Sequence, residues 1–169
     1  MQVKEAKQQF VQAWGALGSQ WGINKTMAQI HALMMVSAEP LSTEDIMEEL
    51  AISRGNANMN IRELTDWGLV TKVFKPGERR DYFVGEKDVW KIAKQVAKIR
   101  KTRELDPILK LLEAIKNENF HVKNEELKQF QKMVNDVYKL ATNVDRLIEG
   151  IFKAEESWFW DKILKLFSK

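Results

Sequence analysis

A run of hydrogen-bonding side chains between Ser53 and Arg62 offers chemistry of one kind, the recognition of another molecule. Asparagine amides pair with adenine edges in a DNA groove, and arginine pairs with guanine or with phosphate oxygens. A glycine lets the backbone approach a ligand closely, and a methionine can contact a thymine methyl group. We expect the nucleic-acid contacts of this run to come from Ser53, Arg54, Gly55, Asn56, Asn58, Met59 and Arg62.

Groups that enzymes use are scarce elsewhere in the sequence. It has two histidines, His31 and His121, no cysteine, no glycine-rich phosphate loop and no HExxH zinc motif. The lack of cysteine also excludes disulfides and thiolate metal sites. We therefore expect no catalytic residues, no cofactor, no metal site and no enzymatic activity.

Length and composition set the outer limits. At 169 residues and 44% hydrophobic, the chain can bury a core of its own, as one domain or as a small domain with an extension. A net charge of +3 is only mildly basic, so any affinity for nucleic acid must come from local clusters. No signal peptide and no run of about 20 apolar residues are present, which predicts a cytoplasmic protein.

Two short helices joined by a tight turn are expected to position the polar run. Ser42, which follows Glu39-Pro40, can cap the first helix, and Ser53 can cap the second. Gly68 is expected in the left-handed conformation just after the second helix ends. On that helix the residues expected to face the core are Ala57, Ile61 and Leu64. This is the pattern of a helix-turn-helix, whose second helix reads DNA.

A basic hairpin is predicted directly after these helices. Residues 69–74 and 81–84 are rich in β-branched and aromatic side chains, and Pro76-Gly77 between them favours a turn. A hairpin in this place is a wing, and we expect three of its side chains to contact DNA: Lys75, Arg79 and Arg80. An arginine there could enter an adjacent narrow minor groove.

Long helices are predicted on both sides of this domain. The last has the most regular pattern, because Leu127, Phe130, Val134, Val137, Ala141, Val144, Ile148 and Ile151 alternate three and four residues apart. Such a heptad seam requires a partner helix, from the same chain or from another copy. The residues expected at a dimer interface are Trp14, Leu17, Leu109, Leu112, Phe130, Val134 and Val137.

The sequence thus predicts a mainly α protein with a small β-hairpin wing, in which N- and C-terminal dimerisation helices flank a winged helix-turn-helix. The predicted segments are an N-terminal helix over 1–23, the winged helix-turn-helix over 24–86 and a C-terminal helical region over 87–169.

The motifs in this order resemble a known family. The stretches WGALGSQWGINKTMAQIHALM, EPLSTEDIMEELAISRGNANMNIRELTDWGLV and GERRDYFVGEKDVWKI are similar to the GbsR branch of the MarR-type winged-helix regulators. The resemblance covers roughly residues 14–112 and implies a homodimer that binds a pseudo-palindromic operator in double-stranded DNA and represses transcription. It implies DNA contacts from Ser53, Arg54, Asn56, Asn58, Arg79 and Arg80. It also leaves room for a small-molecule effector, which the sequence does not identify.

Two other functions remain open from the sequence. The winged helix could be a protein-interaction module that has lost DNA binding and uses its long helices as a scaffold. The tail SWFWDKILKLFSK is a short basic amphipathic segment, which either closes a helical bundle or attaches to a membrane surface; bundle closure is favoured.

Overall fold

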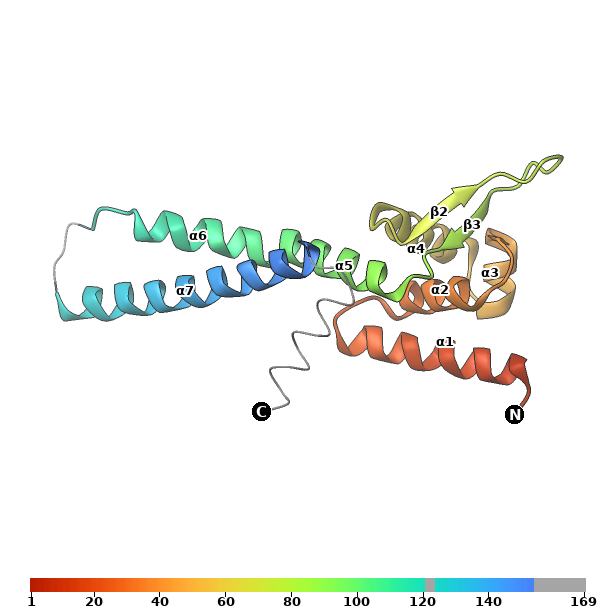
Figure 1. Ribbon diagram of the computed structural model, residues 1–169, viewed down its shortest axis with the longest axis horizontal. Helices are drawn as coiled ribbons and strands as arrows, with labels where there is room; N and C mark the ends of the chain where they lie inside the picture. The colour runs from red at the N-terminus through yellow and green to blue at the C-terminus, as the bar shows by residue number, and fades with distance from the viewer. Residues whose placement is uncertain (121–123, 154–169) are drawn as a thin grey trace. The chain divides into compact units, whose positions relative to one another are not determined.

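The computed structural model describes residues 1–120 and 124–153, which form helices and one small antiparallel sheet (Figure 1). The elements up to the hairpin are α1 (Val3–Gln20), α2 (Lys25–Val36), β1 (Leu41–Ser42), α3 (Thr43–Leu50), α4 (Arg54–Asp66), β2 (Val70–Val73) and β3 (Tyr82–Gly85). The helices that follow are α5 (Val89–Arg100), the π-helical turn η1 (Lys101–Leu105), α6 (Asp106–Lys116) and α7 (Glu125–Lys153). The predicted fold class, a mainly α winged helix-turn-helix with a small β hairpin, is confirmed.

The chain divides into two compact units within α5, after Gln95. The first unit contains both the predicted N-terminal helix and the predicted winged helix-turn-helix. In the described part of the chain, no helix combines the length and the apolar character needed to cross a membrane. The amphipathic tail predicted over residues 157–169 lies outside the described residues.

The core of the first unit forms around α2, which packs against α1, α3, α4 and β3. Met27, Ile30 and Met34 of this helix are almost completely buried. Close packing with α1 depends on Gly18, because a Cβ at that position would lie 2.6 Å from the Cβ of Ala28. Gly18 therefore allows α1 and α2 to pack closely.

The sheet has the strand order β1-β3-β2 and is antiparallel throughout. Strands β2 and β3 form the predicted wing, with Val70 opposite Gly85 and Val73 opposite Tyr82. The strand β1 was not predicted, because two residues are too few to show an alternating pattern. Its second residue, Ser42, pairs with Tyr82 and also caps α3, where its hydroxyl accepts a hydrogen bond from the Asp45 backbone N–H at 3.2 Å.

In the second unit, α6 and α7 lie side by side and run in opposite directions (Figure 1). Val134 and Ala141 of the predicted seam are buried in this unit. Pro107 lies in the first turn of α6, a position in which proline is tolerated because the first backbone N–H groups of a helix have no partner within it. The helix passes through η1 without a side-chain cap, and Asp106 instead forms an ion pair with Lys101 at 2.9 Å.

Lys101 in η1 connects the start of α6 to the far end of α7. Its Nζ lies 2.9 Å from Asp106, 2.9 Å from Asp145 and 3.6 Å from Glu149, and 16% of its side chain is exposed. Hydrogen bonds to Asp106 and then to Asp145 raise the pKa of the Lys101 amine above its ordinary value. The stabilisation from this amine is therefore fully present at neutral pH and is lost only as the pH rises above the ordinary lysine pKa of about 10.4.

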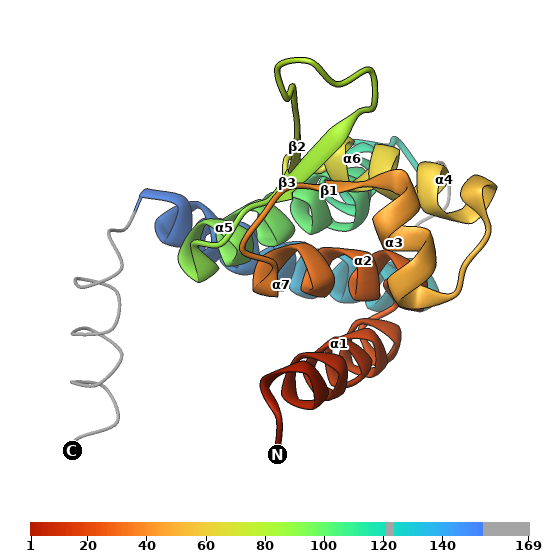
Figure 2. The same ribbon diagram turned by 90° about the vertical axis from the view of Figure 1, so that its right-hand side faces the viewer.

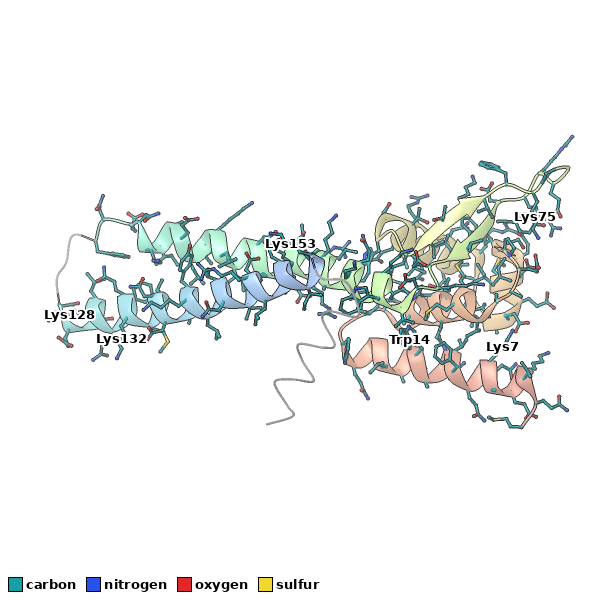
Figure 3. All side chains as sticks on the ribbon, viewed as in Figure 1. Lys7, Trp14, Lys75, Lys128, Lys132 and Lys153 are labelled. Carbon is teal, nitrogen blue, oxygen red and sulfur yellow. The ribbon has the colours of Figure 1, made fainter. Side chains whose placement is uncertain are left out.

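We expect Lys101→Met to lower the thermal unfolding temperature, because the substitution leaves three carboxylates close together without their cation. A matched control is Lys128→Met, which removes a well-exposed ion pair with Glu125. Lys128 lies near the start of α7 and is labelled in Figure 3. Exposed pairs of this kind contribute little, so the control should unfold near the wild-type temperature. Equal behaviour of the two variants in a thermal melt followed by circular dichroism would contradict the role given to Lys101.

Candidate nucleic-acid interface

The turn between α3 and α4 sets the direction of the polar run. Ala51 ends α3 in the left-handed conformation, with φ of 52°, and its backbone N–H donates to the carbonyl of Met47. Ser53 then caps α4, and its hydroxyl accepts from the backbone N–H of Asn56 at 3.3 Å. Both predicted serine caps are confirmed, and so is the left-handed Gly68 after α4, with φ of 67°.

The buried face of α4 is the predicted one. Ala57, Ile61 and Leu64 are each at most 3% exposed, and α4 packs against α2 and α3. The helix is thereby held by its apolar side, and the opposite side faces solvent. Of the residues expected to contact nucleic acid, those with exposed side chains or open space around them are Ser53, Arg54, Gly55, Asn58, Met59 and Arg62.

Asn60 lies within the polar run but was not among its expected DNA contacts. It is completely buried, and its amide donates to the backbone carbonyl of Asn56 at 2.8 Å and to the Asn56 Oδ1 at 2.7 Å. Asn56 is consequently half-buried and held in place from the inside of the helix. The asparagines of α4 therefore differ in role, since Asn60 orients Asn56 whereas Asn58 is exposed.

Contacts with α3 fix two further side chains at the start of α4. The Arg54 Nη2 lies 2.6 Å from the Glu44 Oε1, and both side chains are exposed. A hydrogen bond from its own backbone N–H and the bond from Arg54 lower the pKa of Glu44, so this carboxylate is ionised at neutral pH. The Asn58 Oδ1 accepts from the Thr43 hydroxyl at 3.4 Å. Helix α3 thus orients Arg54 and Asn58, which the sequence alone did not indicate.

The wing carries four cations against two carboxylates between Lys72 and Asp81. Both carboxylates are engaged within the hairpin, since Asp81 pairs with Lys72 at 2.8 Å and Glu78 accepts from the Tyr82 hydroxyl. The Lys75 Nζ lies 4.2 Å from the centre of the Tyr82 ring.

The two arginines at the tip of the wing differ in their contacts. The Arg80 Nη2 is 3.5 Å from Glu78, and Arg79 has no ion-pair partner among the described residues. The loop that holds them extends away from the helices of its unit (Figure 2). The positive charge of the wing is therefore concentrated at a projecting tip.

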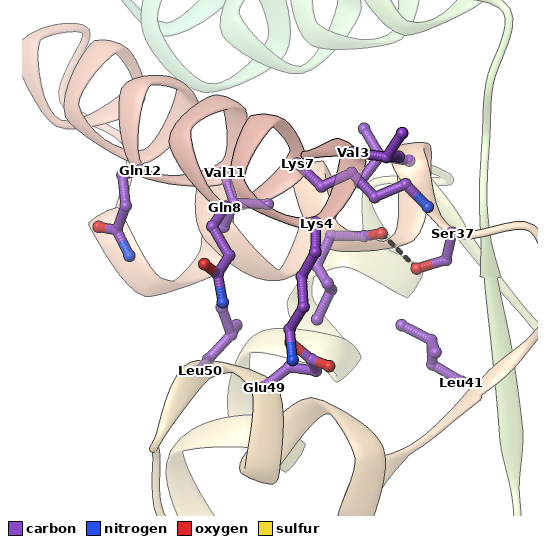
Figure 4. A pocket seen from close by; sticks show the side chains of 12 residues that line it. Val3, Lys4, Lys7, Gln8, Val11, Gln12, Ser37, Leu41, Glu49 and Leu50 are labelled. Carbon is purple, nitrogen blue, oxygen red and sulfur yellow. Dashed lines mark hydrogen bonds between the residues drawn. The ribbon is translucent and has the colours of Figure 1, made fainter. Parts of the chain in front are cut away.

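A groove between α1 and α3 is a concave feature of the first unit. It has a volume of about 670 Å³, with apolar residues such as Val11, Leu41 and Leu50 beside polar ones (Figure 4). Lys4 and Lys7 of α1 lie along one wall and Glu49 of α3 along the other. Its size is in the range of small-molecule sites, and one wall belongs to the helix-turn-helix.

This arrangement matches known proteins. Residues 21–81, which run from the end of α1 through the wing tip, match the MarR family. Over these residues the winged helix-turn-helix is similar to that of the MarR family.

Two relatives from Bacillus subtilis (strain 168) are similar to part of this chain. The HTH-type transcriptional repressor GbsR is 30% identical over 71 residues, which cover 42% of this chain and 39% of GbsR. The putative HTH-type transcriptional regulator YvaV is 20% identical over 88 residues, which cover 52% of this chain and 50% of YvaV. The chain thus spans half or less of the length of these curated relatives. The similarity to a GbsR-type regulator expected from the sequence is confirmed.

One solved structure of a transcriptional regulator has the same fold. It superimposes with a TM-score of 0.65 at 17% sequence identity, and the match covers 86% of this chain and 94% of that one. The match extends beyond the MarR-type domain, so the helices that flank the domain belong to a fold found in another protein.

Proposed function

We propose that this chain is a DNA-binding transcription regulator that binds a pseudo-palindromic operator as a homodimer and represses transcription. The observation that carries the proposal is a MarR-type winged helix-turn-helix whose recognition helix, α4, exposes Arg54, Asn58 and Met59 on the side opposite its buried face. These groups can pair with base edges, contact thymine methyl groups and bind phosphates. The repressor GbsR, which is 30% identical over 71 residues, supports the choice of repression.

The distribution of charged residues supports different DNA contacts for α4 and for the wing. The first half of α4 carries Arg54 and the amides of Asn56 and Asn58. The second half carries Glu63 and Asp66, which repel phosphates, beside Arg62. We infer that the N-terminal half enters the major groove and that the basic wing contacts the flanking backbone and minor groove. Backbone N–H groups at the start of α4 add to the attraction for phosphate.

A second apolar row on α7 supports a homodimer. In addition to the residues buried inside the unit, α7 leaves six large apolar side chains exposed, alternately three and four residues apart: Phe130, Met133, Val137, Leu140, Val144 and Leu147. That spacing is the a/d repeat of a coiled coil, and the row is roughly 26 Å long at 1.5 Å per residue. An apolar row of this length in water is stabilised by a partner helix, and we infer that the partner is α7 of a second copy.

The row also refines the predicted dimer contacts. Of these, Phe130 and Val137 belong to the exposed row and Leu17 of α1 is exposed, whereas Val134 is already buried within its own chain. Leu109 and Leu112 of α6 and Trp14 of α1 are half-buried, and the Trp14 ring stacks on Phe10. The proposed interface therefore uses the exposed row of α7, and two winged helices in such a dimer would read half-sites about one helical turn apart.

The groove between α1 and α3 supports control by a small molecule. A ligand there would contact Lys4 and Lys7 of α1 and Leu50 at the end of α3, so its binding energy would depend on how these two helices are placed. A ligand that prefers one placement shifts the population of the DNA-binding form. The lysines favour a ligand with a negatively charged group and an apolar body.

A gel-shift titration with DNA from the region upstream of the protein's own gene tests the proposal. We expect a shift at low salt and an affinity that falls steeply as salt is added, because contacts to phosphates release bound counterions. The double variant Arg79→Ala/Arg80→Ala, which lacks the phosphate and groove contacts of these arginines, should bind about tenfold more weakly or worse. A suitable control is Lys128→Ala, which removes a cation at the start of α7. A folded dimer that fails to shift the fragment at low salt would overturn the proposal.

The alternative, a protein-interaction module without DNA binding, is supported by the same exposed row on α7, which could receive a helix from another protein. The wing variant separates the two functions. Under the alternative, Arg79→Ala/Arg80→Ala retains every interaction of the protein, because the wing takes no part in binding the partner helix.

A further inference from the structure

Phe74, at the end of β2, is exposed to an unusual degree for an aromatic residue. Its side chain is 81% accessible, and of the large hydrophobic residues in the described part of the chain only Met1 is more exposed. It lies just beyond Val73, the last residue of β2 that pairs with β3. The ring therefore contributes little to the core or to the sheet, since burial is the usual source of stabilisation by an aromatic side chain.

The surroundings of the ring are basic. The Lys72 Nζ lies 5.5 Å from the centre of the Phe74 ring, and Lys75 follows directly in the chain. Lys72 also pairs with Asp81, so the charge of that carboxylate is already neutralised. An apolar ring among cations is complementary to a ligand that presents negative charge next to a flat apolar surface, and a nucleic acid does so with phosphates beside sugars and bases.

We propose that Phe74 is a DNA-contacting wedge, which enters the minor groove beside each half-site and partly unstacks one base step. The inference rests on the proposed function, because α4 must bring the wing to the flank of the half-site. Phe74 is the first residue of the loop between β2 and β3, and this loop projects away from the helices of its unit (Figure 2). The cations of the wing, Arg79 among them, would bind the phosphates on either side while the ring occupies the groove. DNA bending toward the major groove accompanies wedges of this kind.

The experiment uses the full-length protein and a duplex that the wild-type protein selects from a random-sequence pool. A 2-aminopurine base is placed in turn at each position flanking the half-site, and its fluorescence reports unstacking. We expect an increase at one flanking position with wild-type protein and none with Phe74→Ala, whose affinity by fluorescence anisotropy should fall roughly tenfold, in line with the loss of an aromatic–base contact. Phe74→Trp should restore both signals.

The matched control is Val89→Ala, which truncates another exposed apolar side chain, 65% accessible, outside the wing. It should bind and unstack the DNA like the wild type, and circular dichroism should show all three variants folded. Wild-type affinity and fluorescence in Phe74→Ala would overturn the wedge but leave the proposed function intact. Failure of the wild-type protein to enrich any duplex would instead overturn the proposed function. A third outcome is that the wild-type protein binds anionic phospholipid vesicles, whereas Phe74→Ala does not bind them and still binds DNA like the wild type. This outcome would overturn the wedge in favour of a membrane contact.

Discussion

Replacing Leu140 by glutamate is expected to convert the protein from a dimer to a monomer. Leu140 lies in the middle of the exposed row on α7 and is 65% accessible in the single chain. In the proposed dimer it would be buried, and burying an unpaired carboxylate costs about 3 kcal/mol or more per copy. With two copies in one interface, the dissociation constant should rise by roughly 10⁴-fold. Sedimentation velocity at micromolar concentration measures the change, and operator affinity should fall with it.

The control for this substitution is Lys139→Glu, on the same turn of α7 but outside the row. It alters the charge even more, yet it should leave the dimer intact because its side chain stays in water. Circular dichroism would verify that both variants keep their helices. A dimer that survives Leu140→Glu with unchanged affinity would show that the partner of α7 is not a second copy of α7.

Acidification is expected to destabilise the first unit through a single histidine. His31 on α2 is 4% exposed, and burial without a hydrogen-bond partner for its Nε2 among the described residues lowers its pKa from 6.5 to about 4. The unfolded chain binds a proton below about pH 6.5, whereas the folded chain does not until about pH 4. The contribution of His31 to stability is therefore constant above pH 6.5 and falls as the pH decreases toward 4, by roughly 3 kcal/mol in all.

Urea unfolding at pH 7.5 and at pH 4.5 measures this loss. The comparison is His31→Leu, which fills similar space with a side chain that cannot be protonated. Most of the difference in free energy of unfolding between the two pH values should disappear in this variant. The carboxylates with lowered pKa, such as Asp45 and Asp88, lose their contributions only as the pH falls through values below about 4, so they do not account for the change. Parallel pH profiles for the two proteins would contradict the assignment to His31.

Local patterns were enough to predict the winged helix-turn-helix. The serine caps, the glycine after α4 and the 3.6-residue spacing of Ala57, Ile61 and Leu64 are each determined by a few neighbouring residues, and all were found in the structure. A single interpretation also satisfied them all, since cap, turn and hairpin signals agreed on the same boundaries. Agreement of this kind between local signals is what makes a fold predictable from sequence.

Features that depend on distant neighbours were not predictable. The sequence assigned no role to Asn60, and only the structure shows that it is buried and that its amide supports Asn56. The ion pairs of Lys101 with Asp145 and Glu149 join residues more than forty positions apart, so no spacing in the sequence indicates them. The sequence predicted a single seam on α7. In the structure its residues fall into two groups, because Val134 and Ala141 are buried inside the unit whereas Phe130 and Val137 are exposed. A helix pattern reports which residues are apolar and does not say which partner covers them.

Ser42 belongs to two elements at once, and this has a consequence for how the domain opens. As a strand residue it is paired with Tyr82 in the wing, and as the cap of α3 it holds the first turn of the helix-turn-helix. Local opening of either element would break the contacts of the other, so the wing and α3 should exchange their amide hydrogens as one cooperative unit. A DNA contact that slows the local opening of the hairpin would then also slow the opening of α3, the helix that orients Arg54.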